Sequence, residues 1–415
     1  MTSPMSFSIM SPSKQLSQTF IRLGVSRHFN PRILSASSLL TINSYNNNNN
    51  LNIYSSHSPS KHSTQLRYFT QTRSKMSATN NAAWIKAAKS HPFVVEPAPV
   101  WTPEANEILV KNHAIAINPV DGSLQAAGWW PLNYPTMLGQ DVAGVVAAVG
   151  PGVTAFKVGD RVVGHAVGMA TKRDQDNAFQ EYTIVQTNMA THLPDQIAYE
   201  KAAVLPLAMS TAACALYQDT HLNLQLPTVP RQKPNGKTFI VWGGASAVGS
   251  NAIQLAVNSG YEVITTASPK NFEYTKKLGA SQVFDYASPT VQDDLINALK
   301  GKTSAGALDC IGGAPQGILQ QVLAKSEGVK AIASTKRGWP EPPEGVQMYS
   351  IFGTTLKDNF VGKAIYNDFL PAALAAGTYV PAPEPVIVGK GVEKIQEAVD
   401  LVKKGVSAAK LVVTL

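Results

Sequence analysis

The segment that constrains the fold most begins at Lys237, where strand-like and helix-like stretches alternate. "KTFIVWGG" is nearly all apolar and predicts a buried strand, and "AVGSNAIQLAVNSG" after it has helical spacing and closes on Gly260. "YEVITTA", "SQVFDY", "ALDCIGG" and "GVKAIAS" repeat the strand pattern, with helical stretches between them. Strands that are apolar on both faces and alternate with helices predict a parallel, doubly wound sheet covered on both sides. We therefore expect an α/β fold.

The first strand of this series runs directly into a glycine-rich turn and then into a helix. "GGASAVG" (243–249) is a variant of G-x-G-x-x-G, with Ser246 where a glycine often stands. A turn tight enough to aim helix N–H groups at a pyrophosphate requires small residues. The pattern alone is weak, but between a buried strand and a helix it indicates a dinucleotide site. The residues expected at this turn are Gly243, Gly244, Ser246, Ala247, Val248 and Gly249.

The end of the next strand indicates which dinucleotide is bound. An NAD site places Asp or Glu there, about 20 residues after the turn, to bind the ribose 2′-hydroxyl. This chain has Ser268, Pro269 and Lys270 at that point, and no acid before Glu273. A hydroxyl and a cation suit a 2′-phosphate, which an acid would repel. The sequence therefore favours NADPH.

The rest of the chain from about residue 83 divides into a β-rich part and a return at the end. Residues 83–203 contain short strand patterns separated by Gly and Pro, such as "EILVKNHAIAINP" and "DVAGVVAAVGPGV". The last 55 residues mix helices and strands, which would complete this first domain. We predict a first domain at 77–205, completed by 356–415, and a dinucleotide domain at 206–355.

Residues 1–76 form a leader with a composition of its own. They hold no Asp or Glu and eight Lys or Arg, so the body has 27 basic and 27 acidic residues and is neutral. An Arg-rich, Ser-rich and acid-free leader is typical of an organelle transit peptide, which predicts a mitochondrial protein. The alternative is a cytoplasmic protein that starts at Met76. A nucleic-acid-binding arm is less favoured, and no run approaches the ~18 apolar residues of a membrane span.

Several stretches of the body resemble the medium-chain dehydrogenases/reductases, in particular the zinc-free quinone oxidoreductases and the fungal trans-enoyl-reductase-like proteins. They include "NHAIAINPVD" (112–121), "YPTMLGQDVAGVV" (134–146), "VWGGASAVGSNAIQLA" (241–256) and "TASPKNFEYTKKLGA" (266–280). The resemblance covers residues 82–415. It implies a GroES-like β-rich domain, built from both ends of the chain, that faces a Rossmann domain with a doubly wound parallel sheet. The active site would lie between them.

The resemblance also implies roles for single residues. Asn118 matches a polar group that faces the substrate, and Thr211 matches a threonine beside the nicotinamide. Some relatives donate a proton from the tyrosine of a "G-x-Y-P" element, where this chain has Trp130. Tyr134 lies four residues later, so it is either a catalytic residue or a pocket wall. The cofactor contacts implied beyond the turn are Ser268, Lys270, Tyr274, Tyr286, Phe352 and Gly353.

We expect no metal. Zinc-dependent relatives carry a His-Glu pair where this chain has Gln140 and Asp141, and Gln is a poor ligand for zinc. Catalytic zinc needs three protein ligands, and a four-cysteine structural site is impossible because the chain has two cysteines, Cys214 and Cys310. A buried Asp141 would need a partner. Arg161 is the candidate, with Asp160 as its rival for that arginine.

These expectations favour an NADPH-dependent oxidoreductase without zinc. It would transfer hydride to an α,β-unsaturated carbonyl (an enoyl thioester or enone) or to a quinone, because an enolate can be held by one or two hydrogen-bond donors. The alternative is a non-catalytic NADPH-binding sensor or structural protein of the same fold. The expected partner is a small-molecule or acyl-thioester substrate, with no nucleic acid and no membrane, and the chain would be a monomer or homodimer.

Overall fold

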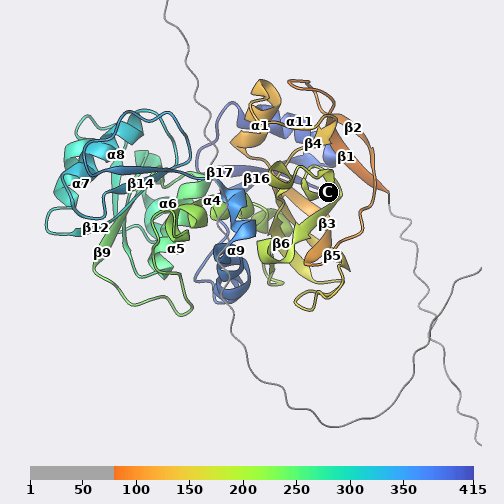
Figure 1. Cartoon of the computed structure of the whole chain (residues 1–415), viewed down its shortest axis with the longest axis horizontal. Coiled ribbons are helices and arrows are strands. Elements are labelled where there is room, and N and C mark those ends of the chain that lie inside the picture. Colours follow the sequence, from red (N-terminus) through yellow and green to blue (C-terminus); the bar gives the residue numbers. More distant parts are fainter. Residues whose placement is uncertain (1–78) are drawn as a thin grey trace, which may run out of the picture. The chain divides into compact units, whose positions relative to one another are not determined.

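Residues 79–415 are the part of the chain that the computed structural model describes (Figure 1). The leader at 1–76, with its predicted transit peptide, lies outside them. Within the described residues no helix is both long enough and apolar enough to cross a membrane.

The first domain is built on a seven-stranded sheet with strands from both ends of the described chain. Their order is β16-β17-β3-β5-β6-β8, and β7 pairs with β3. All pairs are antiparallel except β16 with β17. The strands are β3 (Glu107–Ala116), β5 (Asp141–Val149), β6 (Arg161–His165), β7 (Tyr182–Gln186), β8 (Ala190–His192), β16 (Glu384–Lys390) and β17 (Ala409–Thr414).

A second, three-stranded sheet and short helices accompany this sheet. The small sheet has the order β2-β1-β4 and is antiparallel. Its strands are β1 (Asn80–Ile85), β2 (Val94–Ala98) and β4 (Thr136–Met137). The helices are α1 (Pro119–Ala127), α2 (Gly168–Thr171), α3 (Tyr199–Ala202) and α11 (Ile395–Val402), with single 3-10 turns at Asp174–Asp176, Thr187–Met189 and Val392–Lys394.

The dinucleotide domain contains an entirely parallel seven-stranded sheet, as the alternating pattern predicts. Its order is β11-β10-β9-β12-β14-β15, and β13 pairs with β12. This is the strand order of a Rossmann sheet, with the reversal between β9 and β12. The strands are β9 (Lys237–Trp242), β10 (Glu262–Ala267), β11 (Gln282–Asp285), β12 (Thr303–Asp309), β13 (Glu327–Gly328), β14 (Ala331–Ser334) and β15 (Gln347–Ser350).

Helices cover both faces of this sheet because its strands are apolar on both faces. In β9, Phe239 and Val241 pack in one core with Ile253 of a helix, whereas Ile240 and Trp242 pack in the other core with residues of two further helices. The first core is continuous with that of the first domain. The helices are α4 (Pro206–Tyr217), α5 (Ala247–Asn258), α6 (Phe272–Lys277), α7 (Val291–Ala298) and α8 (Ala314–Ala324).

A helical return leads from the parallel sheet to β16. It consists of a 3-10 stretch at Gly353–Asp358, α9 (Phe360–Lys363), a π-helical stretch at Ala364–Phe369 and α10 (Leu370–Ala375). The β-rich first domain and the Rossmann sheet expected from the sequence are thus both present. The domain boundaries proposed above stay predictions.

Candidate functional site

The glycine-rich turn lies between β9 and α5, at the carboxyl end of a central strand. Gly243 has a φ of +85°, a conformation that favours glycine, and its N–H donates to Thr266 Oγ1 at 3.0 Å. Ser246 is the N-cap of α5, where its Oγ accepts from Gly249 N at 3.0 Å. The serine that departs from the glycine pattern therefore caps the helix.

Two further glycines are required because other protein atoms lie where a side chain would begin. A Cβ on Gly249 would lie 2.2 Å from the carbonyl oxygen of Gly243, and a Cβ on Gly244 would lie 2.2 Å from Thr265 Oγ1. Neither distance is possible for a real side chain. Ala247 and Val248 form the first turn of α5 and are half-buried. The turn has the steric character that a bound pyrophosphate requires at a helix N-terminus.

The residues expected around the adenosine end follow β10 and β11. Ser268 follows β10, and its Oγ accepts from Asn271 Nδ2 at 3.1 Å, while Lys270 is exposed. Tyr274 OH and Ser250 Oγ are 2.8 Å apart, so this tyrosine ties α6 to α5, and burial raises its pKa to about 12. Tyr286 follows β11 and is half exposed. All three strands β9, β10 and β11 end at the same edge of the sheet.

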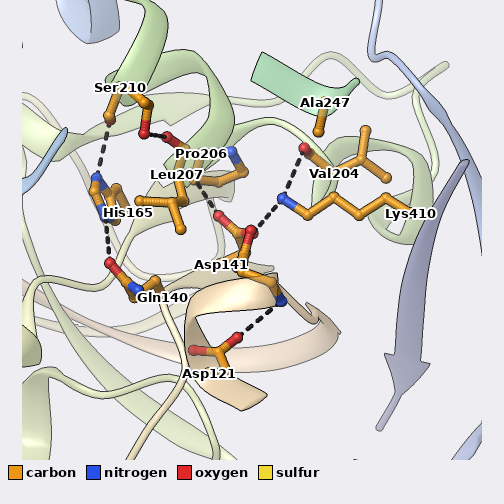
Figure 2. Close-up of polar contacts among 12 residues, drawn as sticks. Asp121, Gln140, Asp141, His165, Val204, Pro206, Leu207, Ser210, Ala247 and Lys410 are labelled. Atoms are coloured by element: carbon orange, nitrogen blue, oxygen red, sulfur yellow. Dashed lines mark hydrogen bonds and ion pairs between the residues drawn. The ribbon is translucent and has the colours of Figure 1, made fainter. Parts of the chain in front are cut away.

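A buried polar centre surrounds Asp141, the first residue of β5 (Figure 2). Its Oδ2 accepts from Asn118 Nδ2 at 2.8 Å and from Lys410 Nζ at 2.5 Å. Its Oδ1 accepts from the backbone N–H of Leu207 at 2.5 Å, in the first turn of α4. Lys410 also donates to the carbonyl of Val204 at 3.2 Å. Asp141 and Asn118 are 0% and 4% exposed, so both are removed from solvent.

The prediction that Arg161 pairs with Asp141 was wrong. Arg161 donates instead to Tyr199 OH and to the carbonyls of Pro194 and Ile197, at 3.1, 2.9 and 2.7 Å. The true partner, Lys410, comes from the last strand, 269 residues away in the sequence. A lysine at the start of the apolar run "KLVVTL" was the available signal, because a lysine in a buried strand needs an anion.

Asp121 extends the polar centre below Asn118. Its Oδ2 accepts from the backbone N–H of Asn118 at 2.8 Å, and its Oδ1 is buried without a partner among the described residues. Burial, together with the nearby charge of Asp141, raises the pKa of Asp121 to about 7. The two carboxyl groups therefore differ in environment: Asp141 forms an ion pair with Lys410, whereas Asp121 forms none within residues 79–415.

A second buried chain of polar groups lies beside Asp141, because His165 of β6 pairs with Asp141 of β5, and the sequence analysis missed it. His165 Nδ1 is 2.9 Å from Ser210 Oγ, which is 2.8 Å from Tyr366 OH. The other ring nitrogen of His165 is 3.4 Å from Gln140 Oε1. Burial lowers the pKa of His165 to about 4, so the ring is neutral at pH 7. Figure 2 shows this chain beside Asp141.

Thr211 lies one residue beyond Ser210, next to the return segment. Its hydroxyl donates to the carbonyl of Leu207 at 2.7 Å. A Cβ on Gly353 would lie 2.9 Å from Thr211 Oγ1, so the two predicted nicotinamide-side residues are adjacent. Phe352, the residue before Gly353, stacks on Trp130 with ring centroids 5.1 Å apart.

The aromatic residues of the 129–134 segment have different surroundings. Trp130 donates from Nε1 to the carbonyl of Met169 at 2.9 Å, so it packs as a plug against Phe352. Trp129 is 50% exposed. The hydroxyl of Tyr134 is buried and has no hydrogen-bond partner among residues 79–415. Of the three aromatic residues, Tyr134 is therefore the one with an unsatisfied buried polar atom.

The donor groups at Gln140 and Asp141 do not fit a zinc ion. Zinc needs three ligands with free lone pairs, from thiolate, imidazole or carboxylate groups. Asp141 already faces the ammonium of Lys410, and both of its oxygens accept hydrogen bonds. Nowhere in residues 79–415 do three or more His, Cys, Asp or Glu side chains gather as possible metal ligands.

The fold and this site define an oxidoreductase of the alcohol-dehydrogenase type. The family model "Alcohol dehydrogenase GroES-like domain" matches residues 104–195, and "Zinc-binding dehydrogenase" matches residues 247–367. The chain belongs to the medium-chain dehydrogenase/reductase superfamily, with the fungal trans-enoyl reductases among its relatives.

Individual relatives are similar to this chain over nearly their whole length. It is 60% identical over 336 residues to the zinc-binding alcohol dehydrogenase domain-containing protein cipB of Emericella nidulans, covering 81% of this chain and 98% of that protein. It is 39% identical over 344 residues to the trans-enoyl reductase himH of Aspergillus japonicus, covering 82% and 98%. The crystal structure of an alcohol dehydrogenase superfamily protein from Novosphingobium aromaticivorans is 25% identical with a TM-score of 0.68, covering 81% and 100%.

Proposed function

We propose that this protein is an NADPH-dependent reductase that acts without zinc on an α,β-unsaturated carbonyl or a quinone. The observation that carries the proposal is the hydrogen bonding of the Asn118 side-chain amide. Its Nδ2 has two N–H groups, and Asp141 accepts one of them. The second has no partner among the described residues, and it is a neutral donor in a buried site. Such a donor suits the partial negative charge of an enolate.

The glycine turn and the ends of β10 and β11 would hold the cofactor. The turn that Gly243, Gly244 and Gly249 make possible would bind the pyrophosphate, and Ser268 and Lys270 would meet the 2′-phosphate. Tyr286 and Phe352 would contact the adenosine and the nicotinamide ends. When bound, reduced nicotinamide would supply the hydride for reduction of the conjugated acceptor.

The residues of the site would then stabilise the developing negative charge and donate a proton. The free N–H of Asn118 would hold the carbonyl oxygen as negative charge develops on it, and one such donor is worth roughly 3 kcal/mol in the transition state. Thr211 has its hydroxyl proton bound to Leu207, so it would accept a hydrogen bond rather than donate one. The α-carbon would take its proton from water or from the Tyr134 hydroxyl.

A panel of acceptors tests this function. Stopped-flow oxidation of NADPH would be followed against quinones, enones and enoyl thioesters, with metal content measured by mass spectrometry on the same sample. We expect turnover with at least one conjugated acceptor, and no loss of rate after treatment with a chelator. Tight NADPH binding with no turnover on any acceptor would favour the non-catalytic sensor instead. A chelator-sensitive rate with stoichiometric zinc would overturn the zinc-free mechanism.

Tyr134→Phe tests the proton donor. The phenol hydroxyl has no hydrogen-bond partner among residues 79–415, so its removal should leave the fold intact while lowering kcat. General acid catalysis contributes about 10²–10⁴-fold, and we expect a loss within that range. Tyr349→Phe, at a half-buried tyrosine on the edge strand β15 outside the proposed site, is the matched control for the loss of a phenol. An unchanged kcat in Tyr134→Phe would make Tyr134 a wall residue.

Cofactor choice is tested at Lys270. Lys270 is exposed, and a cation that meets a phosphate contributes about 1.5–3 kcal/mol through a charged hydrogen bond. Lys270→Ala should therefore weaken NADPH binding by roughly 10- to 100-fold and leave NADH binding unchanged. Lys276→Ala, on the exposed side of α6, is the control. Equal weakening of both dinucleotides would contradict the 2′-phosphate contact.

Cellular location follows from the leader. We propose import into mitochondria if residues 1–76 are used, and a cytoplasmic protein if synthesis starts at Met76. A fusion of residues 1–76 to a fluorescent reporter separates the two, because a diffuse signal would reject the transit peptide.

A further inference from the structure

We infer that Asp141 and Lys410 are a positioning pair that holds Asn118 and Thr211 in fixed relative positions. The inference rests on the proposed function, in which these two residues meet the substrate and the nicotinamide. Neither Asp141 nor Lys410 would touch a reacting atom. They act through the two residues that do.

The first link joins Asp141 to Asn118. The carboxylate accepts one amide N–H of Asn118 at 2.8 Å, which fixes the plane of the amide and the direction of its other N–H. Asp121 holds the backbone N–H of the same residue at 2.8 Å. Asn118 is therefore fixed at its main chain by one carboxyl group and at its side chain by the other.

The second link joins Asp141 to the helix that carries Thr211. The other carboxylate oxygen accepts from the N–H of Leu207 at 2.5 Å, one of the N–H groups that a helix leaves unpaired in its first turn. The carbonyl of the same Leu207 accepts the Thr211 hydroxyl at 2.7 Å. One carboxylate thus reaches Asn118 directly and Thr211 through a single residue.

Lys410 supplies the charge that keeps this carboxylate in place. Its ammonium lies 2.5 Å from the oxygen that also binds Asn118, and it donates to the carbonyl of Val204, just before α4. Lys410 is 3% exposed and Asp141 is fully buried. Removing one partner would leave the other charge buried and unpaired, which is strongly destabilising.

The experiment compares four variants with the wild type: Lys410→Arg, Asp141→Asn, Lys410→Met, and the double variant Asp141→Asn/Lys410→Met. The double variant buries no unpaired charge, so it is the one expected to fold, whereas the single variants can fail through instability alone. We measure NADPH affinity by fluorescence, kcat and KM for the best acceptor, and the position of Asn118 by crystallography. Lys276→Met, which removes an exposed ion pair with Glu273 at 3.0 Å, is the matched control.

The expected results separate positioning from stability. The double variant should bind NADPH within about threefold of the wild type, while kcat falls about 10²-fold, the loss that a displacement of about 1 Å can cause. In its crystal structure, either the Asn118 amide or the first turn of α4 should have moved away from residue 141, because an asparagine there has one acceptor oxygen for the two N–H groups that Asp141 binds. Lys410→Arg should keep most of the rate, because an arginine preserves the charge and the hydrogen bonds.

Two outcomes would overturn the inference. One is a double variant that is stable and has wild-type kcat, because the pair would then serve stability alone. The other is an unmoved Asn118 and Thr211 in the crystal structure of the double variant. The crystal structure decides the inference even if the wild type turns over no acceptor, a result that would refute the proposed function separately.

Discussion

Asp121 provides a quantitative test of the polar centre through the pH dependence of stability. Its carboxyl group is fully buried, and the pKa rises from 3.8 to about 7 because burial disfavours the charged form. In the unfolded chain the group ionises near pH 4, but in the folded protein it stays protonated up to about pH 7. The folded state therefore binds more protons than the unfolded state across this window. The contribution of Asp121 to the free energy of unfolding is therefore present at low pH and is lost as the pH rises from about 4 to 7.

The magnitude follows from the size of the shift. One pKa unit corresponds to 1.36 kcal/mol, so a shift from 3.8 to about 7 corresponds to ~4 kcal/mol, of which ~3 kcal/mol falls between pH 4.5 and 8. Asp121→Asn removes the ionisation and keeps an oxygen that can accept the Asn118 N–H. Relative to wild type, the variant should therefore gain about 3 kcal/mol of unfolding free energy over this interval.

The assay is urea unfolding followed by tryptophan fluorescence, at pH values from 4.5 to 8, for both proteins. The difference between the two proteins cancels the titration of all other groups. Asp219→Asn, at an exposed carboxylate after α4, is the control and should show no such trend. A difference that stays constant within about 0.5 kcal/mol, or that falls with pH, would refute the reasoning about Asp121.

Three more substitutions test the site. Burial lowers the pKa of His165 from 6.5 to about 4, so the wild type should lose up to ~3 kcal/mol of unfolding free energy as the pH falls through that interval. His165→Asn should lose less, as measured by urea unfolding at pH 7 and pH 4.5. Gly249→Ala should abolish NADPH binding in calorimetry, because its Cβ would lie 2.2 Å from the Gly243 carbonyl. Gly317→Ala, inside α8 with its nearest neighbour 3.6 Å away, should instead raise stability by about 0.5–1 kcal/mol in thermal unfolding. A stabilised Gly249→Ala or a destabilised Gly317→Ala would contradict the contacts described for these glycines.

The parallel sheet could be predicted from the sequence because its signals are local. The apolar strand at 237–242, the glycine turn and the helix after it are adjacent in the chain, and each has a pattern of its own. Strand β15 was missed because it is short and only half-buried, so it shows no apolar run. The GroES-like fold came from the resemblance, since its short strands are not distinctive by themselves.

The polar centre could be predicted only in part because its members are far apart in the sequence. Asn118 and Thr211 were expected from the resemblance, and the structure links both to Asp141. Arg161 was a reasonable partner for Asp141 because it is near in sequence and charged. The pairing with Lys410 depends on β17 entering the sheet beside β3, which no local pattern reveals. The chain from His165 to Tyr366 was missed for the same reason.

The distance between Asp141 and Lys410 along the chain has a consequence during synthesis. Ribosomes add about 5–20 residues per second, so the 269 residues between the two take roughly 15–50 s to make. For that time the carboxylate in β5 has no ammonium, and the sheet lacks β17. The nascent first domain must therefore wait, exposed to chaperones and proteases, until the carboxyl-terminal strand leaves the ribosome. A chain cut short before residue 409 would keep the whole parallel sheet and still never complete the polar centre around Asp141.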